Sequence, residues 1–294
     1  MSYVIHGATG AQGAPVAAAL AASGASVTAL TRNADAVVAG ARVRAVDFHS
    51  VEALTEAYRG AEGVFVHLPL GAEQDRLAYA RNVVAALTAA RPARVVFSTS
   101  GGTPVEMADP AVVTVIDGLK AGSPSHAVIA PRLFLENLLL PPVVTGAREQ
   151  GVLRYPLRGD YAVSWASHLD VADAAVALFR RPDVNGLVEV GHDPGTTGPE
   201  LAEAFGARMG RAVTYEALTP AAFAESLAPL LGSGAAGGVA GLYDFLATLP
   251  DNAIASARSA QKLLGLAPRT TLQWLADAGP APSEGGSRAQ GAYR

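Results

Sequence analysis

The chain of 294 residues contains no cysteine, and its hydrophobic runs are short. Without thiols it has neither disulfides nor thiolate chemistry. No apolar run approaches the ~20 residues that a membrane-spanning helix needs, so we expect no membrane segment. The N-terminus begins with a strand pattern where a signal peptide would carry basic residues, which predicts a cytoplasmic protein.

The chain also lacks a strong excess of positive or negative charge and any cluster of metal ligands. The formal net charge is -4, and no basic stripe interleaved with aromatic residues occurs, which disfavours a nucleic-acid partner. The six histidines are scattered, so no metal site is expected. The chain has neither a Gly-x-Ser-x-Gly elbow nor a phosphate-loop lysine, which argues against hydrolases and kinases.

The first thirteen residues carry the strongest positive signal. A short apolar strand over residues 2–5 runs into Gly7-Ala8-Thr9-Gly10-Ala11-Gln12-Gly13, and a helix follows over residues 12–23. Gly7 permits a sharp turn, Gly10 lets the backbone approach a pyrophosphate, and Gly13 lets the helix pack closely on the sheet. The free N–H groups and the dipole of the helix N-terminus favour phosphate. We therefore expect this turn, with Thr9, Ala11 and Gln12, to bind a dinucleotide.

Apolar strand patterns then alternate with helical ones along the chain. This order predicts an α/β fold with a doubly wound parallel sheet, whose ligand crevice lies at the carboxyl ends of the strands. The expected strands cover residues 25–31, 43–46, 63–68, 93–98 and 126–130, and the expected helices cover 34–39, 51–58, 72–89 and 110–121.

The ends of the second and third strands indicate which cofactor is bound. An acidic residue after the second strand binds the ribose 2′-OH of NAD, whereas the arginine found here, Arg32, suits the 2′-phosphate of NADP. We therefore expect NADP(H), with a solvated surface arginine as the alternative. Asp47 is placed to accept a hydrogen bond from the adenine amino group, unless it caps the following helix, a role that Ser50 also fits. Phe48, Leu68 and Ser98 complete the expected cofactor contacts.

Several motifs together resemble the NmrA-like atypical short-chain dehydrogenase/reductases. They are the glycine turn, Leu30-Thr31-Arg32-Asn33, Val46-Asp47-Phe48, and residues 129–137 (IAPRLFLEN). The resemblance spans residues 1–278 and implies a Rossmann domain over 1–150 and a smaller, discontinuous substrate-binding part over 151–278. Residues 186–191 would return to the sheet. The Gly-, Pro- and Ser-rich residues 279–294 are expected to be disordered.

The chain departs from this resemblance at the catalytic pair. Short-chain reductases generally use a tyrosine with a lysine four residues later, and none of the eight tyrosines here starts such a pair. Lys120 falls late in its predicted helix, where a surface role is expected. At the places where related reductases keep a lysine, this chain has Val113 and Thr114.

Two functions therefore stay open. The first is an NADPH-dependent ketoreductase that positions hydride and an aromatic ketone which activates its own carbonyl, as a polyketide with a neighbouring phenol does. Atypical ketoreductases of antibiotic biosynthesis, including the angucyclinone type, are similar in lacking the pair. The second is a non-catalytic NADP-binding regulator. The oligomeric state is not encoded in any motif.

The expected substrate site combines aromatic and hydroxyl side chains. Tyr155, Tyr161 and Trp165 are candidates for an aromatic wall against a planar substrate, although each also suits a hydrophobic core. Ser98 and Ser100, at the end of the fifth strand, are weak candidates to polarise the carbonyl oxygen. The small-residue run 232–241 reads either as a lid hinge or as a surface loop.

Overall fold

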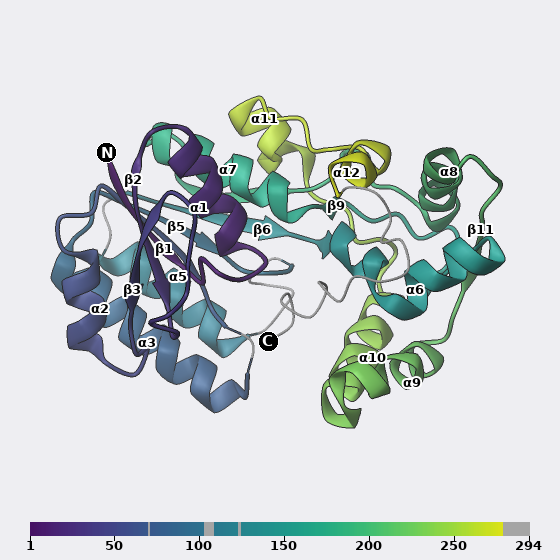
Figure 1. The fold of residues 1–294 in the computed structure, drawn as a ribbon, viewed down its shortest axis with the longest axis horizontal. Coiled ribbons are helices and arrows are strands. Elements are labelled where there is room, and N and C mark those ends of the chain that lie inside the picture. The colour runs from purple at the N-terminus through teal and green to yellow at the C-terminus, as the bar shows by residue number, and fades with distance from the viewer. Residues whose placement is uncertain (70, 103–108, 123–124, 279–294) are drawn as a thin grey trace.

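The computed structural model describes residues 1–69, 71–102, 109–122 and 125–278. Its centre is a seven-stranded parallel sheet with the order β10-β6-β5-β4-β1-β2-β3, in which the chain reverses direction of winding beside β1 (Figure 1). This arrangement confirms the predicted α/β fold with a doubly wound Rossmann sheet. The strands are β1 (Ser2–His6), β2 (Ser26–Thr31), β3 (Ala41–Ala45), β4 (Gly63–His67), β5 (Arg94–Ser98), β6 (His126–Pro131) and β10 (Gly186–Val190).

Helices cover both faces of the sheet, because the central strands are apolar on both sides. One face packs against α2 (Val51–Tyr58), α3 (Glu73–Ala90) and α5 (Pro110–Gly122). The other packs against α1 (Gly13–Ala22), α7 (His168–Arg180) and α11 (Ala260–Leu264). Each face has its own hydrophobic core, and Phe65 and Phe97, on neighbouring strands, are fully buried in opposite ones.

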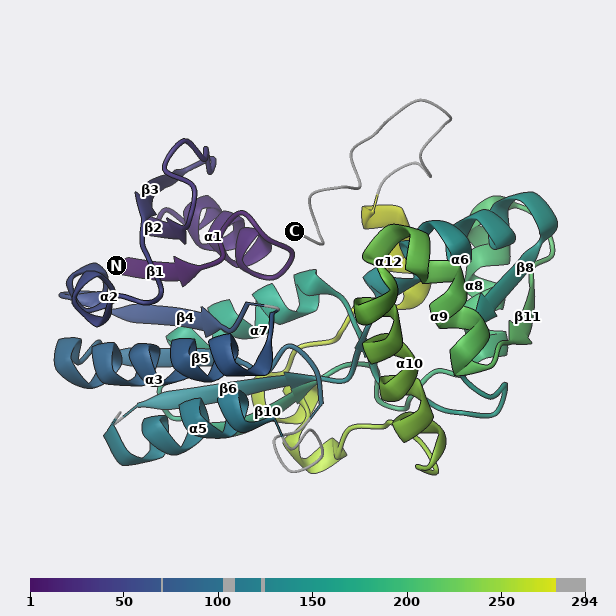
Figure 2. The same ribbon diagram turned by 90° about the horizontal axis from the view of Figure 1, so that it is seen from below.

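A second lobe with a third hydrophobic core lies beyond the carboxyl ends of the strands (Figure 2). Two small parallel sheets, β8 with β11 and β7 with β9, hold it together. Its elements are β7 (Leu133–Phe134), η1 (Leu135–Leu139), α6 (Pro141–Thr145), η2 (Gly146–Gln150), β8 (Val152–Tyr155), β9 (Trp165–Ala166), α8 (Gly198–Met209), β11 (Thr214–Ala217), α9 (Pro220–Leu231), α10 (Ser233–Ala247) and α12 (Thr271–Asp277). The short helix η3 (Ser256–Arg258) packs instead against β10 and α11, beside the central sheet.

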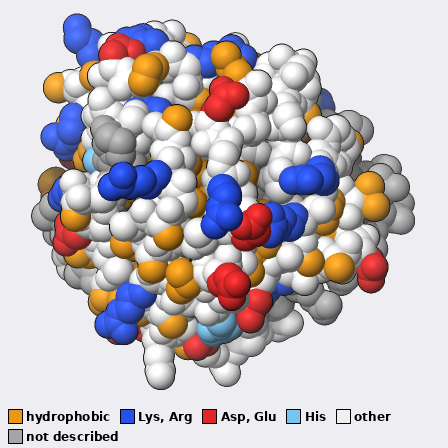
Figure 3. Space-filling model, turned by 90° about the vertical axis from the view of Figure 1, so that its left-hand side faces the viewer, with side chains coloured by type: hydrophobic (Ala, Val, Ile, Leu, Met, Phe, Trp, Pro, Cys, Tyr) orange, Lys and Arg blue, Asp and Glu red, His pale blue; other side chains and the backbone are white. Residues whose placement is uncertain are grey.

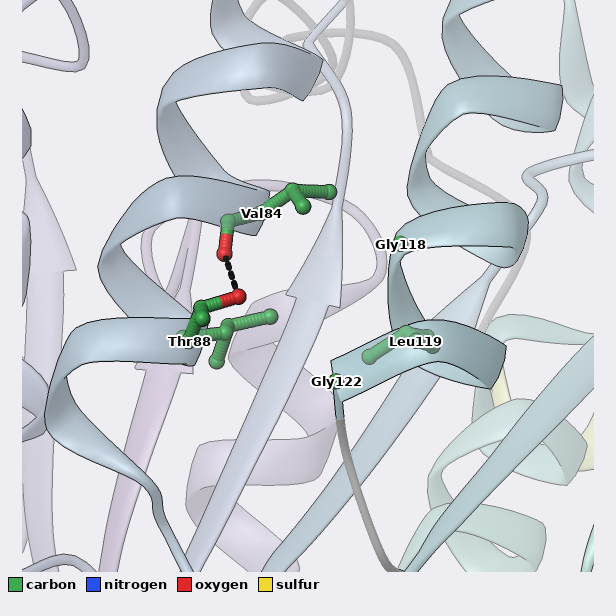
Figure 4. A pocket seen from close by; sticks show the side chains of 6 residues that line it. Val84, Thr88, Gly118, Leu119 and Gly122 are labelled. Carbon is green, nitrogen blue, oxygen red and sulfur yellow. Dashed lines mark hydrogen bonds between the residues drawn. The ribbon is translucent and has the colours of Figure 1, made fainter.

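Glycines allow two close approaches between elements. A Cβ on Gly13 would lie 2.3 Å from the carbonyl oxygen of His6, so α1 contacts the end of β1 directly. A Cβ on Gly118 would lie 2.4 Å from Val84 Cγ1, which lets α5 pack closely on α3. Below this contact the two helices leave a small hollow of about 10 Å³, beside Thr88 and Gly122 (Figure 4). Such a volume holds about one water molecule, so the hollow is no substrate site.

The helix expected over residues 34–39 is absent, and turns take its place. The Asn33 side chain accepts a hydrogen bond from the N–H of Asp35 at 2.9 Å, which favours an Asx turn over a helix. Val37 is 92% exposed, so the segment has little apolar surface to bury. The prediction failed because local side-chain bonding outweighed helix propensity.

The small-residue run 232–241 is neither a loop nor a hinge of several residues. Gly232, with φ of 80°, separates α9 from α10, and the run continues as the first part of α10. Ala236, Tyr243 and Leu246 are buried on one face of α10, whereas its glycines point to open space. The buried residues of this face recur at helical spacing. The glycines between them made this spacing hard to recognise in the sequence.

Basic, acidic and apolar side chains are interspersed on the surface, as Figure 3 shows for one side. Within the described ranges, no helix has the length and apolar character to cross a membrane. The same residues contain no group of three side chains arranged to hold a metal ion. The tail predicted to be disordered, 279–294, lies outside the described residues.

The α1–β1 contact yields a stability prediction. Replacing Gly13 with alanine forces the Cβ against backbone oxygen, so we expect the free energy of unfolding in urea to fall by about 3 kcal/mol. Gly237→Ala is the matched control, because a Cβ there meets nothing within 4 Å in the exposed part of α10. It should raise the free energy of unfolding by about 1 kcal/mol. Equal effects of the two substitutions would contradict the close contact.

Candidate functional site

The turn after β1 has the geometry expected of a phosphate cradle. Gly7 adopts a φ of 56°, which favours glycine, and the N–H of Gly10 donates back to the Gly7 carbonyl at 2.7 Å. No side chain caps the N-terminus of α1, and no acidic residue lies in its first turn. Its first N–H groups therefore remain suited to an anion. Thr9 is exposed and Ala11 is half-buried at the surface of this turn.

A polar network joins the turn to the end of β5. The Ser98 hydroxyl donates to Gln12 Oε1 at 2.8 Å, and Gln12 Nε2 donates to the Ser100 hydroxyl at 2.9 Å. Ser100 has a φ of 66°, a left-handed conformation that costs energy for a serine. The sequence predicted Ser98, Ser100 and Gln12 separately, and the structure brings them together. Their linkage was missed because residues 86 and 88 positions apart carry no local signal.

Arg32 and Asp47 lie at neighbouring strand ends on the same side of β1. Arg32, after β2, is exposed, and its guanidinium forms no hydrogen bond or ion pair with the residues that the structure describes. Asp47 Oδ1 accepts from the N–H of His49 at 2.9 Å. The cap of α2 is Ser50, whose hydroxyl accepts from the N–H of Ala53, so Asp47 does not serve as that cap.

Phe48 and Leu68 are buried and belong to the core between the sheet and α2–α3. The Phe48 ring packs against the rings of His6 and Tyr79 on the core side of the strand ends. Lys120 is 66% exposed and pairs with Asp117 at 3.4 Å, in agreement with the surface role expected for it.

The three aromatic residues expected to form a wall are instead part of the third core. Tyr155, Tyr161 and Trp165 are each only 1% exposed. The ring of Tyr155 packs edge-on against Trp165, with centroids 5.5 Å apart, and its hydroxyl bonds that of Tyr243 on α10. Of the two roles that the sequence allowed, the structure shows the hydrophobic core, because burying these large rings stabilises the lobe more than leaving them in water.

Two histidines beside the turn, one buried and one half-buried, carry no local signal in the sequence. His6, the last residue of β1, lies 2.6 Å from the Tyr58 hydroxyl, and burial with the nearby His67 lowers its pKa to about 3. His67, the last residue of β4, packs its ring where a Cβ of Gly7 would stand, and burial lowers its pKa as well. Both imidazoles are therefore neutral at pH 7.

A carboxyl group lies at the boundary of the two lobes. Glu136, in η1, accepts hydrogen bonds through Oε1 from the N–H of His168 at 3.0 Å and from Trp274 Nε1 at 3.2 Å. Desolvation raises the pKa of Glu136 to about 7, and burial lowers that of His168 to about 4. Strongly shifted groups often mark functional sites, and Glu136 was noted in the sequence only as a member of the 129–137 motif.

Comparisons with known proteins agree with this geometry. A family model described as the NmrA-like family matches residues 3–237, which is most of the chain. The chain belongs to the NmrA-like family. A search of curated proteins found no match for this NmrA-like protein.

Solved structures show the same fold at low sequence identity. A nucleoside-diphosphate-sugar epimerase from Staphylococcus aureus is 19% identical, with a TM-score of 0.78 over 94% of this chain and 99% of that one. An Escherichia coli NADPH-dependent quinone oxidoreductase complexed with NADPH is 24% identical, with a TM-score of 0.74 over 95% and 99%. The Citrobacter sp. triphenylmethane reductase complexed with NADP(H) is 19% identical, with a TM-score of 0.77 over 93% and 98%.

The buried His6 makes the stability of this NmrA-like protein sensitive to acid. Its pKa is about 3 in the fold against 6.5 in the unfolded chain, so its contribution is complete above pH 6.5 and is lost as the pH falls toward 3. Between pH 6.5 and 5 that loss is about 2 kcal/mol. His6→Gln should remove this part of the acid sensitivity, measured by urea unfolding at both pH values. The exposed His49→Gln is the control and should behave as the wild type.

Proposed function

We propose that this NmrA-like protein is an NADPH-dependent reductase whose cofactor lies along the strand ends of its central sheet. The observation that carries the proposal is the combination of the Gly7 turn with an uncapped, uncharged N-terminus of α1. Together they offer backbone N–H groups and a helix dipole to a pyrophosphate. Gly10, Thr9 and Ala11 border the same turn and would contact the phosphates.

Arg32 would bind the 2′-phosphate that distinguishes NADPH from NADH. Its guanidinium is exposed at the end of β2, next to the turn, and forms no ion pair with an acidic side chain among the described residues. A free guanidinium presents donors in the geometry that phosphate oxygens accept. Asp47, at the end of the neighbouring β3, keeps a second carboxylate oxygen available for the adenine amino group.

The substrate that we propose is a ketone on a polycyclic aromatic compound of the polyketide type. The Escherichia coli and Citrobacter proteins of the same fold are named for a quinone and for triphenylmethane, both conjugated ring systems. The second lobe, which stands at the strand ends, exposes the apolar Leu242 and Phe245 on α10. These features support a large, flat and apolar substrate.

When bound, the cofactor supplies hydride. The protein's own contribution is to hold the cofactor on the Gly7 turn and to orient the carbonyl near Ser98 and Ser100. Orientation of this kind removes much of the barrier, and a phenol next to the ketone would further polarise its oxygen. The Gln12 amide fixes both serine hydroxyls, so they form a rigid polar edge beside the reacting groups.

A specific observation favours a second candidate, a non-catalytic NADP-binding regulator. The positions in α5 where related reductases keep a lysine hold Val113 and Thr114. Val113 is 38% exposed, and the Thr114 hydroxyl donates to the Pro110 carbonyl at 2.7 Å. Neither side chain is placed to assist proton transfer. A regulator would need the cofactor site alone.

The deciding experiment combines NADPH binding with turnover. Binding is followed by NADPH fluorescence, and oxidation of NADPH is followed by its absorbance with a panel of hydroxylated polycyclic ketones and anthraquinones. We expect binding together with turnover of at least one compound. Tight binding without turnover across the panel would favour the regulator, and absence of NADPH binding would reject both candidates.

Arg32→Ala tests the choice of cofactor. Loss of the guanidinium should raise the KM for NADPH by about tenfold to a hundredfold, equivalent to one charge-assisted contact of 1.5–3 kcal/mol, and leave that for NADH nearly unchanged. Arg42→Ala, which removes an exposed arginine from β3, is the matched control and should change neither value. An equal change for NADPH and NADH in the Arg32 variant would contradict the assignment.

A further inference from the structure

Three titratable side chains from separate segments meet beside the dinucleotide turn. His67 ends β4 and lies against Gly7, with Nε2 only 2.3 Å from where a Gly7 Cβ would be. Burial lowers the pKa of His168, the first residue of α7, and the neighbouring His67 lowers it further. Its Nδ1 lies 3.7 Å from Glu136 Oε1. The cluster therefore reaches from the Gly7 turn to Glu136, at the edge where ligands of such sheets bind.

The two oxygens of Glu136 differ in their surroundings. Oε1 accepts from the His168 backbone and from Trp274, whereas Oε2 is buried and has no hydrogen-bond partner. Burying an ionised carboxylate with one bare oxygen is costly, so the protonated form is favoured. Asp170 adds repulsion that raises the pKa of Glu136 further, although Arg269 pairs with Asp170 at 2.9 Å. Glu136 thus carries a proton at a pH where ordinary carboxyls have lost theirs.

The histidines of the cluster are unsuited to donate that proton themselves. Burial lowers the pKa of both imidazoles, and His67 lowers that of His168 further, so both are neutral near pH 7. A neutral imidazole is a weak acid, whereas a neutral carboxyl group near its pKa donates readily. Glu136 is therefore the acid of the cluster, and the imidazoles border it as uncharged groups.

We propose that Glu136 is the proton donor of the reductase, in place of the missing tyrosine and lysine. This inference rests on the proposed function. Hydride from the nicotinamide forms the new C–H bond, and the π electrons of the C=O bond move to the oxygen. That oxygen takes the proton from Glu136 as the carboxyl O–H bond breaks, which leaves an alcohol and a carboxylate. Oε2, the oxygen that carries this proton, is buried, so the Glu136 side chain, which is 25% exposed, must turn to present it to the substrate and afterwards to solvent.

The competing explanation is that Glu136 only anchors η1 to α7 and α12. Glu136→Gln separates the two roles, because the amide oxygen still accepts from His168 and Trp274 but the side chain has no acidic proton. Glu149→Gln, at an exposed glutamate of η2, is the matched control. Thermal unfolding and NADPH binding should be unchanged in both variants, which confirms that the fold and the cofactor site are intact.

The first measurement needs neither cofactor nor substrate. Infrared difference spectra of the protein between pH 5 and pH 9 should contain a carboxylic-acid C=O band that disappears near pH 7. The band should be absent in Glu136→Gln and present in Glu149→Gln. A wild-type spectrum without a titrating carboxyl in this range overturns the proposal.

The second measurement uses a hydroxyanthraquinone or other panel compound that the wild type reduces. The kcat of Glu136→Gln should fall at least about 100-fold with little change in KM, and the decline of kcat above pH 7 should vanish. An unchanged kcat or an unchanged pH profile overturns the donor role while leaving the reductase function standing. If the wild type reduces no compound, the proposed function fails and the donor role fails with it, whatever the infrared band shows.

Discussion

The contact between α1 and the end of β1 is the constraint on which the candidate site depends. With only a hydrogen atom at Gly13, the helix begins directly against the carbonyl oxygen of His6, 2.3 Å from where a Cβ would stand. Gly7 turns the chain with φ of 56° to reach that position. This places the helix N-terminus over the strand ends, so one backbone arrangement provides both tight packing and an anion site.

Because the elements pack this tightly, polar side chains at the strand ends are removed from water. His6 finds the Tyr58 hydroxyl, and Ser98 and Ser100 share the Gln12 amide. Glu136 has donors for only one of its oxygens. Burial therefore disfavours charge at this edge, keeping imidazoles unprotonated and a carboxyl group protonated near neutral pH.

The sequence predicted best where a structural role depends on neighbours in the chain. The glycine turn and the strands have short-range patterns, and the structure contains each of them within one or two residues at most ends. The failures needed long-range information. The Asn33 turn replaced an expected helix, and Tyr155 was placed in a wall because its partner Tyr243 lies 88 residues away. Glu136 was visible only as part of a motif, since its partners come from α7 and α12.

The surroundings of this edge explain why it does not use a tyrosine and lysine pair. A lysine lowers the pKa of a tyrosine by placing a positive charge beside it, which requires water or counter-ions to stabilise that charge. Here the helix that would carry the lysine exposes Val113 to solvent and bonds Thr114 back to its own backbone. The two histidines between Gly7 and Glu136 are instead neutral near pH 7. Raising the pKa of a carboxyl group by burial needs no added charge, so Glu136 holds its proton near pH 7 without a neighbouring cation.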